Sequence, residues 1–423
     1  MKILVLNAGS SSQKSCLYDI TGTTLPSRPP QPLWESVVDW THRPGVAEVK
    51  ITTANGAVFE EEIPTQTQSE VTAHVLKTLR QGKTQVVEHL SDINVVGHRV
   101  VHGGQQYRES VWVTAEVKGA IADLASFAPL HNPLNLEGIE AIEKALPDVP
   151  QVAVFDTAFH AQLPLAAAVY PGPYAWYEQG IQRYGFHGIS HQYCAQRTAQ
   201  LMGRNLEDLR LIVCHLGNGC SLSAIRDGHS VDTTMGFTPL DGLMMGTRSG
   251  AVDPGILIYL LRQEGYTADQ LEQILNKESG LKGISGLSTD MRQIKAEATA
   301  GNTRAQLALD IFIHRLRSNL GAMLASLDRL DALVFTAGIG ENSPLIRASA
   351  CEAFKVLGLQ LDPVKNEDYP VDVDVAAPQS PVSVFVIHTQ EDWAIAQDCW
   401  HLLHPQTSTK PLGENRNLDP LSM

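Results

Sequence analysis

Short apolar runs alternate along the chain with longer segments in which apolar residues recur every three or four positions. Five of the short runs are typical of buried strands: Ile3–Leu6, Ile93–Val101, Val152–Phe155, Ala332–Phe335 and Val382–Ile387. The longer periodic segments predict helices over 69–80, 133–146 and 305–330, and a last helix after Asp392. Strands that alternate with helices favour the α/β class.

Two segments half a chain apart share one design. Ile3–Asp19 and Leu211–Asp227 each consist of an apolar strand, a turn of small residues and a second strand that ends on aspartate. A weak internal repeat of this kind suggests two related lobes. Any two strand–turn–strand units share these features, however, so the repeat alone leaves duplication open. A hairpin is expected around Asn55-Gly56, a dipeptide typical of type I′ turns.

Composition narrows the classes of partner and compartment. The 423 residues carry a formal net charge of −14, which argues against nucleic acid or an anionic membrane as the main partner. Six cysteines show no zinc-like spacing and are expected to be reduced thiols. No apolar run approaches the ~20 residues that span a bilayer, and the N-terminal run is too short for a signal peptide. A cytoplasmic protein is therefore expected.

Four turns have the composition of phosphate-binding loops: Asn7–Ser12, His215–Ser221, Met244–Gly250 and Ala337–Asn342. Glycine allows the backbone to approach a phosphate, and small turns direct N–H groups at it. Each turn alone is more simply an ordinary tight turn. Neither a GxxxxGK[ST] nor a strand-linked GxGxxG motif is present. Taken together, the four turns still point to an anionic ligand.

Several charged and polar side chains stand close to these turns in sequence. Arg99 and Arg248 lie in glycine-rich stretches and could clamp a carboxylate or phosphate, or form structural ion pairs. His187 lies between phenylalanine and glycine, which suits a hydrogen-bond donor, although a lone histidine is more often a core residue. Asp156 ends a buried strand and could be an acid, a base or a cap. Glu391 begins the last helix, where it could favour the dipole or orient Mg²⁺.

The motifs in combination resemble the acetokinase family. They occur in order along nearly the whole chain: Asn-Ala-Gly-Ser-Ser-Ser (7–12), Gly-His-Arg-Val-Val-His-Gly-Gly (97–104), Pro-Leu-His-Asn-Pro (129–133), Phe-Asp-Thr-Ala-Phe-His (155–160), Arg-Tyr-Gly-Phe-His-Gly (183–188), His-Leu-Gly-Asn-Gly-Cys-Ser (215–221), Met-Gly-Thr-Arg-Ser-Gly (245–250) and Gly-Ile-Gly-Glu-Asn (338–342). The resemblance implies an α/β fold with two duplicated actin-like (ribonuclease H-like) lobes around a nucleotide cleft. The first lobe is expected to hold residues 1–155 plus 393–423, a C-terminal helix and a mobile tail, and the second lobe residues 156–392.

The resemblance also assigns roles to matching positions. It implies three catalytic residues, Asp156, His187 and Arg248, and two metal-associated residues, Asn7 and Glu391. The substrate-binding residues implied are Arg99, Val101, Leu130, His131, Phe186 and Pro239. The nucleotide-binding residues implied are Lys14, His215, Leu216, Gly217, Asn218, Gly219, Asp290, Met291, Arg292, Gly338, Ile339, Gly340, Glu341 and Asn342. The chain departs from the family pattern at Ala337, where glycine is common, at Met291, where an aromatic residue is common, and at Asp392, where glutamate is usual.

The activity implied by the resemblance is a reversible phosphorylation of acetate to acetyl phosphate by direct in-line transfer from ATP. ATP/ADP would be the co-substrate, Mg²⁺ the metal with Mn²⁺ as a substitute, and a homodimer the assembly. The route served would be acetyl-CoA biosynthesis. A propionate or butyrate kinase of the same family remains an alternative, because one methylene changes pocket binding by only ~1–3 kcal/mol. A more distant alternative is an actin- or chaperone-like ATP-binding protein.

Overall fold

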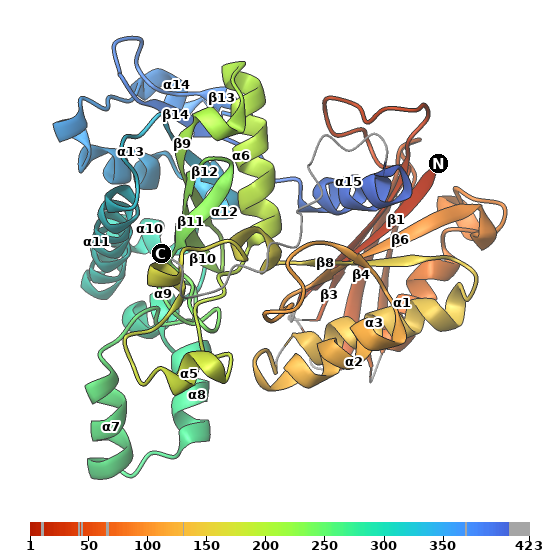
Figure 1. Ribbon diagram of the computed structural model, residues 1–423, viewed down its shortest axis with the longest axis horizontal. Coiled ribbons are helices and arrows are strands. Elements are labelled where there is room, and N and C mark those ends of the chain that lie inside the picture. The colour runs from red at the N-terminus through yellow and green to blue at the C-terminus, as the bar shows by residue number, and fades with distance from the viewer. Residues whose placement is uncertain are drawn as a thin grey trace.

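Two β-sheets, each flanked by helices, form two lobes that lie side by side in the computed structural model (Figure 1). The structure describes residues 1–9, 12–40, 43, 45–64, 67–129, 131–368 and 370–405. The predicted α/β class is therefore confirmed. None of the helices in this described part of the chain has the length and apolar character needed to cross a membrane.

The first sheet has the strand order β5-β4-β3-β2-β1-β6-β8-β7. Its strands are β1 (Lys2–Ala8), β2 (Ser12–Asp19), β3 (Trp34–Asp39), β4 (Val46–Thr53), β5 (Val58–Pro64), β6 (Ile93–Val100), β7 (Val111–Trp112) and β8 (Gln151–Phe155). Strands β1 to β5 form an antiparallel meander, whereas β1, β6 and β8 run parallel. The parallel strands are buried almost throughout, as their continuous apolar runs predict.

The second sheet has the order β11-β10-β9-β12-β14-β13. Its strands are β9 (Arg210–Leu216), β10 (Cys220–Arg226), β11 (His229–Thr233), β12 (Ala332–Thr336), β13 (Val373–Asp374) and β14 (Ser383–Val386). The pairing of β11-β10-β9 is antiparallel, and β9, β12 and β14 are parallel. This repeats the order and directions of β3-β2-β1-β6-β8 in the first sheet. The two halves suspected from sequence thus have the same topology.

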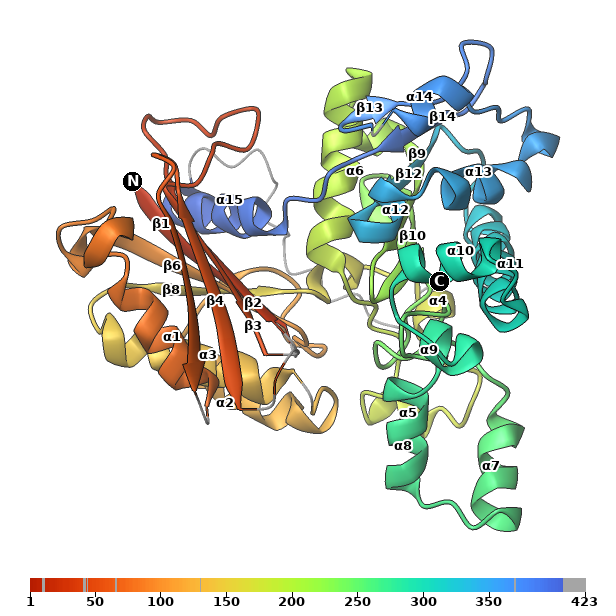
Figure 2. The same cartoon turned by 180° about the vertical axis from the view of Figure 1, so that it is seen from behind.

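Helices cover both sheets (Figures 1 and 2). The helices beside the first sheet are α1 (Gln68–Lys77), α2 (Ala115–Asp123), α3 (Asn132–Ala145) and α15 (Glu391–Leu403). The others are α4 (Leu165–Ala168), α5 (Ala175–Glu178), α6 (Gly188–Met202), α7 (Pro254–Gln263), α8 (Ala268–Lys277), α9 (Gly280–Ser285), α10 (Met291–Thr299), α11 (Thr303–Ala325), α12 (Ala337–Asn342), α13 (Pro344–Glu352) and α14 (Pro363–Glu367). Helices α7 and α8 project from the second lobe, away from both sheets.

The last helix returns from the second sheet to pack on the first. Trp393, Ile395 and Cys399 of α15 are buried against the face of the sheet opposite α1 and α3. The approach is close at Gly97 of β6, where a Cβ atom would lie 2.6 Å from both Cys399 Sγ and Ile395 Cγ2. Glycine is therefore needed at this position. Helices α6 and α15 share one buried cluster, which joins the two lobes.

Two local expectations are wrong. Ala337–Asn342, expected as a loop, is the short helix α12. The β4–β5 turn is not type I′, because Gly56 has a positive φ of 85° but Asn55 does not. Thr53 accepts a hydrogen bond from Gly56 N at 2.9 Å, and Asn55 Oδ1 accepts one from Ala57 N at 3.3 Å. These bonds stabilise a longer turn in which only glycine is left-handed. The tail expected to be mobile lies almost wholly outside the described residues.

Candidate active site

The ends of β6 and β8 bring Arg99 and Asp156 together. Oδ2 of Asp156 accepts hydrogen bonds from Nε and Nη2 of Arg99, at 3.0 and 2.5 Å. Asp156 is 1% exposed, and the Arg99 side chain is 16% exposed. Burial raises the pKa of Asp156, while the charge of Arg99 opposes this shift. The buried carboxylate therefore depends on Arg99 for its charge, and it holds the guanidinium in one orientation.

His187 precedes helix α6 and is tied to the same strand end. Its backbone is left-handed, with φ 57°. The next residue, Gly188, donates its N–H to the carbonyl oxygen of Asp156 at 2.9 Å. A Cβ atom on Gly188 would lie only 2.2 Å from that oxygen. Glycine at 188 is thus what lets α6 begin directly against Asp156, with His187 beside it.

The β9–β10 turn places Gly219 between His187 and Arg248. A Cβ atom on Gly219 would lie 3.2 Å from Nε2 of His187 and 3.7 Å from Nη1 of Arg248. Both side chains therefore face the same small space beside the turn. Arg248 Nη1 also donates to Pro239 O at 3.4 Å. Burial lowers the pKa of Arg248, and Arg99 adds to this shift, so the two guanidinium groups interact.

His187 is a neutral ring in these surroundings. Burial lowers its pKa well below the usual value, and the nearby histidines 191 and 215, Arg99 and Arg248 act in the same direction. The rings of His187 and His215 stack with centroids 4.1 Å apart. A neutral imidazole has one N–H donor and one acceptor nitrogen. Its chemistry toward an anion therefore depends on which nitrogen carries the hydrogen.

The segments expected to bind nucleotide are adjacent in the second lobe. Gly246 N donates to Asn218 O at 3.0 Å, and a Cβ atom on Gly246 would lie 2.1 Å from Asn218 Oδ1 and 3.3 Å from Thr289 Cβ. The 244–250 loop thus contacts both the β9–β10 turn and Thr289, the residue before Asp290. Asp290 caps helix α10, where its Oδ1 accepts from Arg292 N at 2.8 Å.

Helix α12 is held by side chains at both ends. Glu341 Oε1 accepts from Ala337 N at 2.8 Å and from Thr389 N at 3.2 Å. Arg347 is fully buried and donates Nη1 to the carbonyl oxygens of Gly340 and Glu341, at 2.9 and 2.7 Å. Arg347 was not predicted as a site residue from the sequence. Its only sequence signal is a charged residue on the apolar side of α13.

Asn7 lies against the start of α15. Its Nδ2 donates to Glu391 Oε2 at 3.2 Å and to Asp392 Oδ1 at 2.9 Å. Lys14 pairs with Asn7 in the β1–β2 ladder, and its charge lowers the pKa of Asp392, which burial raises overall. Among the described residues, no three acidic, histidine or cysteine side chains form a metal-binding group. One or two carboxylates with an amide oxygen nevertheless suit Mg²⁺, which usually takes its other ligands from water and phosphate.

Four of the residues expected to form the acetate pocket, Val101, His131, Phe186 and Pro239, lie in the described part of the chain. Val101 and Phe186 are buried in the same apolar cluster. His131 precedes α3, and burial followed by the charges of Arg99 and Arg248 lowers its pKa to about 3. The carbonyl oxygen of Pro239 accepts a hydrogen bond from Arg248. Leu130 lies outside the described residues.

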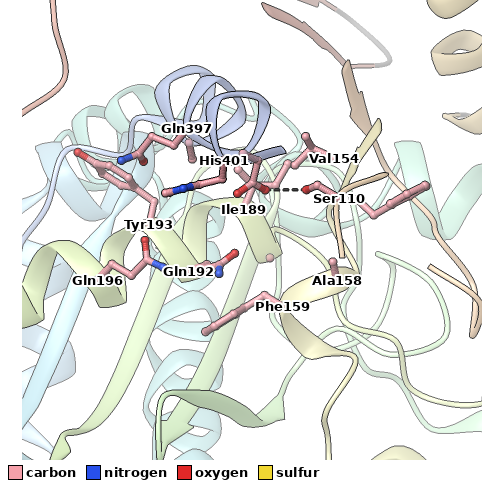
Figure 3. Close-up of a pocket in the computed structure, with 14 residues that line it drawn as sticks. Ser110, Val154, Ala158, Phe159, Ile189, Gln192, Tyr193, Gln196, Gln397 and His401 are labelled. Atoms are coloured by element: carbon pink, nitrogen blue, oxygen red, sulfur yellow. Dashed lines mark hydrogen bonds between the residues drawn. The ribbon is translucent and has the colours of Figure 1, made fainter. Parts of the chain in front are cut away.

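A separate cavity of about 60 Å³ lies between α6 and α15. Figure 3 shows its lining, which includes Gln192, Gln196, Gln397 and His401, and the hydrogen bond from Ser110 to Asp398 at 2.6 Å. None of the expected site residues lines it. Because its lining comes mainly from α6, α15 and the end of β8, the cavity belongs to the joint between the lobes and not to the substrate site.

Comparison with known proteins agrees with this arrangement. The profile of the acetokinase family matches residues 2–397. The chain belongs to the acetokinase family. It is 63% identical over 409 residues to an acetate kinase of Cyanothece sp., covering 97% of this chain and 100% of that protein. It is 64% identical over 403 residues to an acetate kinase of Nostoc sp., covering 95% and 100%.

Solved structures support the same family. The crystal structure of Porphyromonas gingivalis acetate kinase matches with a TM-score of 0.86 at 39% identity, covering 95% of this chain and 99% of that one. A propionate kinase from Francisella tularensis matches with a TM-score of 0.85 at 37% identity, covering 94% and 98%. The expected family, the duplicated actin-like fold and the kinase class are thereby confirmed. The roles of individual residues are proposals, developed below.

Proposed function

We propose that the chain catalyses direct transfer of a phosphoryl group between ATP and acetate. The observation that carries this proposal is the convergence of Arg99, His187 and Arg248, with Asp156, at the edge of the β9–β10 turn. Two guanidinium groups and a neutral imidazole form a site for a carboxylate and for the charge that develops on a transferred phosphoryl group. An actin- or chaperone-like ATP-binding protein has no need of this cluster.

The position of each side chain supports a specific role in this reaction. Arg99, oriented by Asp156, holds the acetate carboxylate, and Val101, His131, Phe186 and Pro239 surround the methyl group. Arg248 stabilises charge on the transferring phosphoryl group, and His187 donates a hydrogen bond to one of its oxygens. The contacts of Asp156 support a role in positioning Arg99. Direct transfer needs no covalent phosphoenzyme.

The nucleotide would lie along the second lobe. Its phosphates face the β9–β10 turn (His215, Leu216, Gly217, Asn218 and Gly219) and helix α12 (Gly338, Ile339, Gly340, Glu341 and Asn342). Its adenosine is placed near Asp290, Met291 and Arg292. Lys14 reaches the phosphates from the first lobe. Mg²⁺ would be held by Asn7 and Glu391, with Mn²⁺ as a substitute, and when bound it neutralises phosphate charge.

The test is an acyl phosphate assay in which hydroxylamine traps the product. Formation of acetyl phosphate from acetate and Mg-ATP, with a higher kcat/KM than for propionate or butyrate, is expected. A preference for propionate would move the assignment to the propionate kinases, one of which is among the structural relatives. ATP hydrolysis that does not depend on any carboxylate would refute the proposal.

A second test addresses the site directly. Arg248→Ala should lower kcat by on the order of 10²-fold or more, because one lost donor to a developing charge costs about 3–4 kcal/mol. Asp290→Ala is a useful comparison, since that carboxylate caps α10 away from the reacting groups and its loss should act mainly on the KM for ATP. Near-normal turnover by Arg248→Ala would contradict the assigned role.

The assembly is proposed to be a cytoplasmic homodimer of two-lobed subunits, with lobes of residues 1–155 plus 393–423 and 156–392. All ten residues of α7 are described and none is buried. Its Ile256, Ile258, Tyr259 and Leu261 are 44–55% exposed. An exposed apolar helix of this kind marks a protein interface, and α7 projects freely (Figure 1). Ile258→Glu should therefore shift the mass measured by light scattering from dimer to monomer, whereas Glu272→Gln on neighbouring α8 should not.

A further inference from the structure

Behind His187 lies a buried hydroxyl that contacts two histidines. Ser221 Oγ of strand β10 lies 2.9 Å from Nδ1 of His187 and 2.7 Å from Nε2 of His191. Ser221 and His191 are both 0% exposed. Nδ1 of His191, the far end of the series, has no hydrogen-bond partner among the described residues. The three groups thus form a hydrogen-bonded chain in which Ser221 and His191 are fully buried.

The single hydrogen of the serine hydroxyl couples the two rings. If Ser221 donates to His187 Nδ1, it must accept from His191, so both histidines carry their hydrogen on Nε2. If Ser221 donates to His191 instead, His187 must carry its hydrogen on Nδ1. His187 then presents an unprotonated Nε2, and His191 holds a buried N–H without an acceptor, which costs about 1–3 kcal/mol. Two arrangements use the serine hydrogen while both rings are neutral. In a third, Ser221 accepts from both rings, and its own hydrogen then has no acceptor among the side chains that the structure describes around it.

The open end of the chain faces the reacting groups. Nε2 of His187 points to the space beside Gly219 that Arg248 Nη1 also faces. An anionic phosphoryl oxygen in this space needs an N–H and is repelled by a nitrogen lone pair. Burial lowers the pKa of both His187 and His191 well below the usual value, so neither ring supplies a second hydrogen by protonation. The tautomer of His187 therefore decides whether it stabilises or opposes the transferred group.

We infer that Ser221 and His191 are positioning residues that fix His187 in its Nε2–H tautomer, so that a neutral imidazole donates to the phosphoryl group. The chain runs from His191 Nε2–H to Ser221 Oγ, and from the Ser221 hydroxyl to His187 Nδ1. It changes no bond and moves no proton during turnover. The inference rests on the proposed function for the role of His187, but the tautomers themselves can be measured without any reaction.

The direct test is nitrogen NMR of the wild-type protein labelled with ¹⁵N-histidine. The His187 and His191 signals are assigned by their loss in His187→Asn and His191→Gln. Protonated Nε2 and unprotonated Nδ1 on both rings is the expected result. A hydrogen on Nδ1 of His187 in the wild-type protein would overturn the inference. This measurement needs no variant to be active.

The functional test compares two serines on one strand. Ser223 of β10 is also 0% exposed and loses a buried hydrogen bond, to Ser230 at 2.9 Å, when changed to alanine. Ser221→Ala should lower kcat by about 10- to 100-fold with little change in either KM, and its His187 signal should show both tautomers. Ser223→Ala should keep kcat within about twofold at a similar loss of stability. Equal kcat values for the two variants, or an unchanged tautomer in Ser221→Ala, would overturn the inference.

Failure of the proposed function would look different. His187→Ala would then turn over acetate at the wild-type rate, although in the wild-type protein both histidines carry their hydrogens on Nε2. That outcome overturns the use of the chain in catalysis together with the role of His187. A slow His187→Ala variant combined with an Nδ1–H ring in the wild-type protein overturns the positioning chain alone.

Discussion

The Arg99–Asp156 pair leads to a stability prediction that depends on pH. Arg99→Ala leaves the carboxylate of Asp156, only 1% exposed, without the cation that makes both of its hydrogen bonds. Removing one partner of a buried pair costs about 3–5 kcal/mol, because the remaining charge is uncompensated. We therefore expect the free energy of unfolding of Arg99→Ala to fall by about 3 kcal/mol or more at pH 8.

The loss should shrink as the pH is lowered. Burial already raises the pKa of Asp156 in the folded protein, and removing Arg99 takes away the charge that opposes this shift. In the unfolded chain the carboxyl group of Asp156 has a pKa of about 3.9. Between these two pKa values the folded variant holds a proton that the unfolded chain has released, so its stability falls as pH rises. The slope approaches roughly 1.4 kcal/mol per pH unit. The difference from wild type is therefore expected to be small at pH 5 and large at pH 8.

Urea unfolding followed by tryptophan fluorescence, at several pH values between 5 and 8, measures this difference. The matched control is the double variant Arg99→Ala/Asp156→Asn, in which the uncompensated charge is gone. It should recover most of the lost stability at pH 8 and show little of the extra pH dependence. A loss in Arg99→Ala that is the same at pH 5 and pH 8, with no recovery in the double variant, would refute the reasoning.

Three further predictions concern single positions. Ala337 has a φ of 64°. A left-handed backbone costs a residue with a side chain roughly 1–2 kcal/mol in the folded protein. Glycine removes this cost but lowers stability by about 0.4–1 kcal/mol, because it makes the unfolded chain more flexible. Ala337→Gly should therefore raise the melting temperature slightly, and a lower melting temperature in calorimetry would contradict this. The Cβ atom of Gly188→Ala would lie 2.2 Å from Asp156 O. This variant should lower kcat by on the order of 10²-fold, because His187 is displaced. Gly119→Ala on α2, where the Cβ atom enters open space, should leave kcat unchanged. His388 donates a hydrogen bond to the Glu341 carboxylate, which raises the pKa of His388. The stabilising effect of this pair is full below about pH 6.5 and is lost as pH rises through the raised pKa. Since His388 is half exposed, His388→Gln should lower the free energy of unfolding by at most about 1 kcal/mol at pH 6 and by less at pH 8. An equal loss at the two pH values in urea unfolding would disprove the linkage.

The elements that the sequence predicted well are those whose own residues determine them. Strands such as Val152–Phe155 and Ala332–Phe335 are continuous apolar runs, and burial follows directly from that pattern. Helix α12 was not predicted, because two of its six residues are glycine. In the structure it is held by hydrogen bonds of Glu341 and Arg347. Glu341 bonds to the first N–H group of its own helix, and Arg347 reaches back from α13. Helix propensity does not include side-chain contacts of this kind.

The candidate site divides in the same way. Arg99 is the second-last residue of β6, and Asp156 directly follows the adjacent parallel strand β8, so their meeting could be anticipated once the two strands were placed side by side. Ser221 was recognised only as part of a glycine-containing turn, although its side chain links two histidines 30 and 34 positions earlier. A serine in a strand carries no sequence signal for such a contact. The register of β9 and β10 against α6 had to be known first.

The route of the chain into α15 has a consequence for the order of synthesis. The sheet that contains β1 is complete in its strands by Phe155, but one of its faces is covered by α15, among whose buried residues are Trp393, Ile395 and Cys399. A growing chain therefore carries an uncovered apolar surface until α15 (Glu391–Leu403) has been translated. Such a surface is a target for chaperones and for aggregation. A truncation that removes α15 should leave the nascent first lobe insoluble, and supplying that helix as a separate peptide should rescue it.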